Sequence, residues 1–122
     1  MSLSIHIISE GPDDQYAFEE TPYGIFDGVG SERLWAAPVI RELGATYLPQ
    51  LTHGYLRVRS EETGDFLREC ATLLAHAPQI TAATLEAPTI YTAHEHYVER
   101  NLSTMIYMTF HARRNEGGIL IW

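Results

Sequence analysis

The chain has 122 residues, 45% hydrophobic and 20% charged, a composition that is typical of one folded domain and argues against a disordered chain. Sixteen acids against eight basic residues give a net charge of −8, which disfavours direct binding to nucleic-acid phosphates or to anionic lipid. No apolar run is long enough to cross a bilayer, the N-terminus lacks the pattern of a secretory signal, and one cysteine cannot form an internal disulfide, so we expect a cytoplasmic protein.

The first predicted element is a β-strand over residues 3–9, where the β-branched residues Ile5, Ile7 and Ile8 lie close together. Residues 10–30 follow and match neither the helical nor the strand pattern. We therefore predict a long connection without regular structure over residues 10–30. A connection of this length in a compact domain is either functional or mobile.

The next segment is predicted to be helical from Ser31 to Leu43. Ser31 is a favourable N-cap, and apolar residues recur every three to five positions after it. Gly44 is predicted to end the helix. Pro38 inside the pattern predicts a kink or a division into two short helices.

Residues 54–60 alternate between apolar and polar side chains, which predicts a strand with one face on the core and the other in solvent. Ser60 is predicted to cap a following helix, whose apolar stripe extends from Phe66 to Ala77 and which Pro78 should end. A short helix is predicted near residues 79–86.

The C-terminal third of the sequence allows two interpretations. Residues 92–95, TAHE, match a capping box, so a helix is predicted to begin there. That helix could continue to Arg114 or end near Leu102. We favour the early end, because residues 103–112 are rich in strand formers and are followed by NEGG and ILIW, a pattern typical of a β-hairpin.

These elements predict a single α+β domain over residues 1–122. We expect three or four mostly antiparallel strands packed against two or three helices, with a C-terminal β-hairpin. The sequence contains no internal repeat and no low-complexity linker.

No catalytic residue, metal site or cofactor is predicted from the motifs. The one local group of metal-type ligands is His94 and His96 with Glu99 nearby, but the two histidines point about 200° apart on a helix and cannot share an ion. His96 and Glu99 could reach one metal if another ligand came from elsewhere. The glycines of residues 27–32 lack the spacing of a phosphate-binding loop, and Cys70 is expected to act as a small core residue.

Arg57 and Arg59 share the polar side of the strand predicted over residues 54–60. The chain contains no lysine, so arginine is its only fixed positive charge. We expect these two guanidinium groups to pair with the chain's own carboxylates, for which residues 10–30 are the obvious source. An acidic ligand is the alternative.

The acid-rich connection is the predicted partner-binding segment. Residues 1–32 contain seven acids and no arginine, a charge of −7, whereas the remaining nine acids and eight arginines give −1. Aromatic rings among carboxylates are typical of a protein-binding patch with ring anchors and a charged rim, although the rings could instead pack inward. The predicted binding residues are Asp13, Asp14, Tyr16, Phe18, Glu19, Glu20, Tyr23 and Phe26.

The function that we favour from the sequence is a non-catalytic domain that docks on a basic protein partner. Small acidic inhibitors and immunity-type proteins work in this way, and the analogy is one of charge and size. The alternative is a small enzyme or metal-dependent protein centred on His94, His96 and Glu99. A homo-oligomer is a third alternative, in which the terminal ILIW strand pairs with a second copy.

Overall fold

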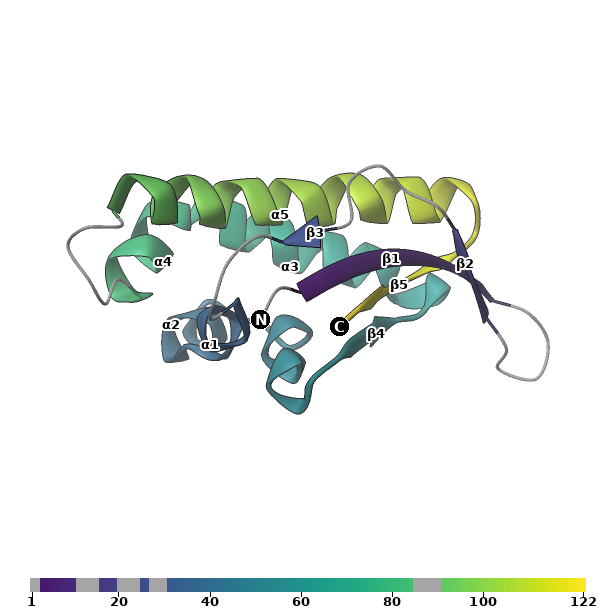
Figure 1. Cartoon of the computed structure of the whole chain (residues 1–122), viewed down its shortest axis with the longest axis horizontal. Coiled ribbons are helices and arrows are strands. Elements are labelled where there is room, and N and C mark those ends of the chain that lie inside the picture. Colours follow the sequence, from purple (N-terminus) through teal and green to yellow (C-terminus); the bar gives the residue numbers. More distant parts are fainter. Residues whose placement is uncertain (1–2, 11–15, 20–24, 27–30, 85–90) are drawn as a thin grey trace.

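Helices cover one face of an antiparallel sheet in the computed structural model, which describes residues 3–10, 16–19, 25–26, 31–84 and 91–122 (Figure 1). Side chains are described over residues 5–9, 34–84 and 98–122. The strands are β1 (Leu3–Glu10), β2 (Tyr16–Glu19), β3 (Ile25–Phe26), β4 (Leu56–Val58) and β5 (Gly118–Ile121). The helices are α1 (Ser31–Ala36), α2 (Pro38–Glu42), α3 (Thr63–Ala75), α4 (Ala77–Thr84) and α5 (Tyr91–Arg114), with 3₁₀ turns η2 (Leu48–His53) and η3 (Ser60–Glu62). The predicted α+β class is confirmed, with more helices and strands than expected.

The sheet has the strand order β2-β1-β5-β4, and every described pair is antiparallel. A two-residue strand, β3, pairs with the beginning of β1. The C-terminal strand β5 therefore lies between β1 and β4. Both of its edges are paired within the chain, so β5 is not the exposed edge strand that the homo-oligomer alternative assumed.

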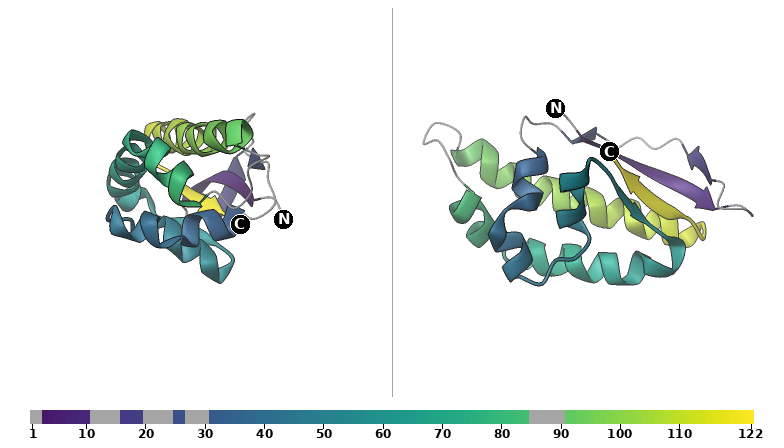
Figure 2. Two further views of the ribbon diagram at one scale, coloured as in Figure 1. Left: turned by 90° about the vertical axis from the view of Figure 1, so that its left-hand side faces the viewer. Right: turned by 90° about the horizontal axis from the view of Figure 1, so that it is seen from below.

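One hydrophobic core lies between the sheet and the helices. The alternate residues of β1, β5 and β4 that face it are Ile5 and Ile7 from β1, Leu56 and Val58 from β4, and Ile119 and Ile121 from β5. Helices α3 and α5 pack against each other beneath the sheet, and α1, α2 and η2 close one end of the core, as the two views of Figure 2 show. This placement leaves the alternate residues of the same strands on the opposite face.

Proline and glycine divide the segment of residues 31–44 as predicted. The chain leaves α1 at Ala36 and begins α2 at Pro38, where the fixed φ of proline suits the first turn of a helix. Gly44 follows the end of α2 with φ of 96°, a left-handed conformation that glycine adopts without strain. The buried residues Trp35 and Ile40 confirm which side of the two helices faces the core.

The boundaries of the next two helices differ from the prediction. Ser60 begins the 3₁₀ turn η3 instead of capping α3, which starts at Thr63. The side chain of Glu62 accepts a hydrogen bond from the Arg59 N–H at 3.2 Å, which satisfies a donor at the start of this turn. Pro78 does not end α3 but lies in the first turn of α4. Backbone N–H groups in the first turn have no acceptor within the helix, so the missing N–H of proline costs nothing there.

The predicted C-terminal hairpin is wrong, because residues 103–112 belong to the continuous helix α5. Val98, Leu102, Met105, Met108 and Ala112 recur every three or four positions and are all buried. Burying each large apolar side chain contributes about 1.5–3 kcal/mol, which outweighs the few tenths of a kcal/mol by which β-branched residues disfavour a helix.

The glycines that suggested a hairpin loop form the end of α5. The Gly117 N–H donates to the Ala112 carbonyl at 2.8 Å and the Glu116 N–H to the Arg113 carbonyl at 3.2 Å, the two bonds of a Schellman motif. Glu116 takes the left-handed position, with φ of 54°. Gly117 then passes close to β1, and the chain enters β5.

The prediction that residues 10–30 lack regular structure is also wrong in part. Two stretches of this segment form β2 and β3, and both pair with β1. Aromatic residues favour strands, and pairing with β1 supplies hydrogen bonds for backbone groups of the acid-rich chain. The high content of acids concealed this strand signal.

Substitution of Gly117 tests how closely the end of α5 approaches the sheet. A Cβ atom added at Gly117 would lie 2.5 Å from the backbone carbonyl oxygen of Ile8. We expect Gly117→Ala to lower the free energy of unfolding by about 1–3 kcal/mol, because β1 must shift to relieve the overlap. Urea unfolding monitored by circular dichroism measures the change.

Gly64→Ala is the matched control for this substitution. Its added Cβ would lie 3.6 Å from Arg113 Nη1, an ordinary contact, and the position is helical. We expect a change between zero and a gain of about 1 kcal/mol, because alanine favours a helix over glycine. Equal effects of the two substitutions would contradict the close approach at Gly117.

Candidate functional site

The predicted partner-binding residues are divided between described and undescribed parts of the chain. Tyr16, Phe18 and Glu19 lie in β2 and Phe26 in β3, with their backbones described. The other four, Asp13, Asp14, Glu20 and Tyr23, lie outside the described residues. Strand β2 is the outermost described strand on its side of β1, so this part of the acid-rich segment forms a sheet edge, which we call the acid-rich edge (Figure 1).

The register of β2 on β1 divides the predicted set between the two faces of the sheet. Position 18 pairs with Ile8 and position 19 with Ile7. Paired positions of an antiparallel ladder share one face. Position 18 therefore belongs to the face opposite the helices, and position 19 to the face of the core.

The face opposite the helices carries two exposed aromatic side chains, Tyr55 and Trp122. A row of paired residues, His6, Leu120 and Arg57, crosses β1, β5 and β4. Tyr55 and Trp122 extend this row at the ends of β4 and β5, with 59% and 48% of their surfaces exposed. We call these five residues the outer sheet face.

Two rings of the outer sheet face are in contact. The centroids of His6 and Trp122 lie 5.4 Å apart with an interplanar angle of 64°, an edge-to-face arrangement. His6 is half-buried, and burial lowers its pKa from the ordinary value of 6.5. The imidazole is therefore held in its neutral form at neutral pH.

The sequence contained a signal for the outer sheet face that we did not use. Alternation in residues 54–60 already placed Tyr55 beside Arg57, and alternation in ILIW places Trp122 beside Leu120. Bringing these two pairs together required the order of the strands, which no local pattern gives.

The expected pairing of Arg57 and Arg59 with the acid-rich segment is not provided by neighbouring strands. The sheet order places β2 at one edge and β4 at the other, with β1 and β5 between them. Three strand spacings of about 4.8 Å separate the two edges. Arg57 in β4 and Glu19 in β2 therefore lie at opposite edges of the sheet.

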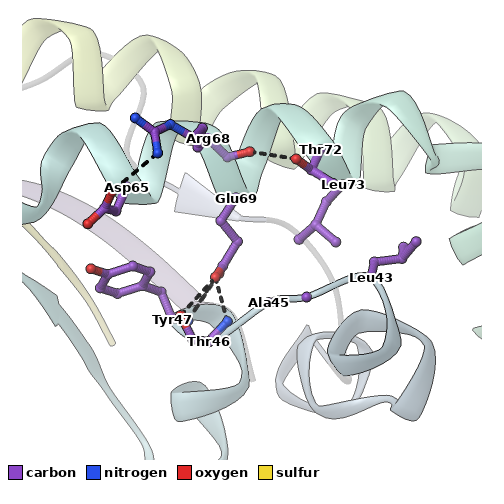
Figure 3. Close-up of a pocket in the computed structure, with 10 residues that line it drawn as sticks. Leu43, Ala45, Thr46, Tyr47, Asp65, Arg68, Glu69, Thr72 and Leu73 are labelled. Atoms are coloured by element: carbon purple, nitrogen blue, oxygen red, sulfur yellow. Dashed lines mark hydrogen bonds and ion pairs between the residues drawn. The ribbon is translucent and has the colours of Figure 1, made fainter.

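The described residues also line an open pocket of about 320 Å³ between α3 and the chain that joins α2 to η2 (Figure 3). Its main polar group is the Glu69 carboxylate of α3. This carboxylate accepts hydrogen bonds from the backbone N–H groups of Thr46, Tyr47 and Leu48, at 3.0 Å for Tyr47 and 2.8 Å for Leu48.

The role of Glu69 is structural. Its carboxylate satisfies amide groups at the start of η2, where the turn itself offers no acceptor. The remaining charged groups of the pocket, Arg68 and Asp65, form an exposed ion pair at 3.9 Å. The Glu69 carboxylate already accepts hydrogen bonds from three backbone N–H groups. The pocket therefore does not indicate which ligand, if any, it would bind.

The group of His94, His96 and Glu99 lies on helix α5, as the capping box predicted. Glu99 is exposed, and the side chains of both histidines lie outside the described set. Among the side chains that are described, no group of three or more His, Cys, Asp or Glu residues could hold a metal ion. The metal alternative therefore stays a prediction that rests on spacing alone.

Cys70 has the environment of a core residue. It is fully buried in α3, and burial raises the pKa of its thiol well above the ordinary value. A thiol that stays protonated and is inaccessible to solvent is a poor nucleophile.

Comparisons with known proteins provide no further assignment. No family model, no curated protein and no solved structure matches the chain. Within the described residues, no helix has the length and apolar character needed to cross a membrane.

Replacement of Glu69 tests its structural role. We expect Glu69→Ala to lower the free energy of unfolding by about 1–3 kcal/mol, because three backbone donors lose their common acceptor. Glu69→Gln retains one acceptor oxygen and should lose less. Asp65→Ala, at an exposed neighbouring acid, is the control and should leave the urea midpoint nearly unchanged. A Glu69→Ala midpoint equal to that of the control would contradict the role.

The lowered pKa of His6 predicts a pH-dependent stability. The unfolded chain binds a proton near pH 6.5 and the folded chain only at lower pH, so stability is complete above about pH 6.5 and decreases as the pH falls from there through the folded pKa. Urea midpoints at about pH 7.5 and about pH 5.5 should differ less in His6→Gln than in the wild type. His53→Gln, at an exposed histidine of η2, should retain the wild-type difference.

Proposed function

We propose that the protein is a non-catalytic binding domain that docks on a basic protein partner through its acid-rich edge and the adjoining outer sheet face. The observation that carries this proposal is the arrangement of the sheet. The edge strand β2 belongs to residues 1–32, which carry a charge of −7, and the face opposite the helices presents the half-exposed rings of Tyr55 and Trp122. Residence in the cytoplasm is part of the proposal and is supported by the single, buried cysteine.

In this proposal, charged and aromatic side chains contribute to binding in different ways. Carboxylates along an edge attract a basic protein over a distance and accelerate association. Aromatic side chains that are half-exposed before binding can be buried on contact, and Tyr and Trp are the residues that most often dominate interface energies. By the strand register, position 18 pairs with Ile8 and lies on the same face of the sheet as His6.

The test compares two variants with the same change in charge. The edge variant converts Asp13 and Asp14 to Asn, and Glu19 and Glu20 to Gln. The control variant converts Glu42, Glu61, Glu99 and Glu116, four exposed acids outside the acid-rich segment, to Gln. Immobilised wild-type protein and both variants are exposed to the source lysate, and the proteins retained are identified.

We expect a basic protein to be retained by the wild type and the control but lost from the edge variant. With that partner purified, the association rate should fall about tenfold in the edge variant at low salt, and its dependence on salt should flatten. Trp122→Ser should instead accelerate dissociation. Equal association rates for the edge and control variants would refute the role of the acid-rich edge in binding. The absence of any basic protein among the retained species would refute the proposed class of partner.

A further inference from the structure

The side of α5 that faces away from the core carries a regular stripe. Arg100, Ser103, Tyr107, Phe110 and Arg114 follow one another at spacings of three, four, three and four residues, and all are exposed. On a helix these positions lie within about 80° of arc, opposite the buried residues of α5. We call these five residues the outer α5 stripe.

The centre of the outer α5 stripe is aromatic. Tyr107 and Phe110 are 53% and 51% exposed, and their spacing of three makes them neighbours on the helix surface. Single exposed apolar residues are common in soluble proteins. Two adjacent rings on a three-four repeat are instead the pattern by which one helix packs along another.

The ends of the outer α5 stripe are positive. Arg100 and Arg114 lie two heptads apart, a separation of about 21 Å along the helix axis. No acid occupies a position of the stripe between them; Glu99 lies about 100° around the helix from Arg100. The protein has a net charge of −8, so the outer α5 stripe is a positively charged strip on a negatively charged molecule.

The charges of the stripe argue against pairing with a second copy of itself. In an antiparallel pair centred on Tyr107, Arg100 of one copy would meet Arg114 of the other at both ends. In a parallel pair, each arginine would meet its own equivalent. Like charges at such flanking positions are unfavourable and act against the pairing. The acid-rich segment of a second copy is a poor helical occupant, because parts of it already form strands β2 and β3.

We propose that the outer α5 stripe binds an amphipathic helix of a different protein that carries carboxylates two heptads apart, with apolar residues between them. Arg100 and Arg114 would pair with the carboxylates, for which the guanidinium fork has the matching geometry. Tyr107 and Phe110 would pack against the apolar residues between. This surface is distinct from the acid-rich edge and does not depend on the function proposed above.

A synthetic peptide tests the proposal with the full chain. The probe is a labelled three-heptad helix with leucine along its inner seam and glutamate at two seam positions two heptads apart; the control peptide carries lysine in place of glutamate. We expect the wild type to bind the glutamate peptide at least about tenfold more tightly than the lysine peptide in fluorescence anisotropy. Phe110→Ser should weaken binding about tenfold or more.

Matched variants separate the stripe from general effects of charge and exposed rings. Arg100→Gln combined with Arg114→Gln should remove the discrimination between the two peptides, whereas Arg68→Gln, at an exposed arginine of α3, should retain it. Tyr55→Ser, at an exposed ring of the outer sheet face, should bind the glutamate peptide as the wild type does.

Four outcomes would overturn the proposal. They are no binding of the glutamate peptide, equal binding of the two peptides, self-association in sedimentation that Phe110→Ser abolishes, and binding of a DNA oligonucleotide that the double arginine variant abolishes. Circular dichroism of each variant establishes that the loss of binding is not a loss of fold, since all the substituted side chains are exposed.

Discussion

The sheet depends on one short strand at the C-terminus. Strands β1 and β4 do not pair with each other, and both pair with β5, whose four residues are buried. The position of β5 is set by the end of α5, where Gly117 passes against the Ile8 carbonyl. The end of the chain therefore joins the N-terminal strand and its acid-rich extension to β4 and the helices that follow it.

The parts of the fold that depend on the backbone conformation of single residues could be predicted from the sequence. Pro38 and Gly44 act through their own backbone conformations, so the division and end of the first helices could be predicted from the sequence. Residues 103–112 could not, because strand propensity and helical periodicity disagreed there. Packing against α3 and the sheet decided in favour of the helix. NEGG was misleading because glycine serves a helix end as well as a hairpin.

The candidate surfaces differ in how far the sequence predicts them. The uneven charge of the first 32 residues is a property of the sequence alone. The contact between His6 and Trp122 is not, because 116 positions separate the two rings along the chain and only the β1–β5 register brings them together. The outer α5 stripe was hidden for a different reason. Its spacing is meaningful only if residues 100–114 form one helix, and the early helix end that we favoured removed that condition.

The distribution of charge gives the two proposed surfaces different physical roles. A molecule of charge −8 attracts a basic partner and repels an acidic one at long range. At physiological salt this field decays over about 8 Å, so the arginines of the outer α5 stripe act mainly on a partner that is already in contact. The acid-rich edge would accordingly govern how fast a basic partner arrives. Arg100 and Arg114 would govern which helix stays bound, because a mismatched charge in a desolvated contact shortens the life of the complex without changing the encounter.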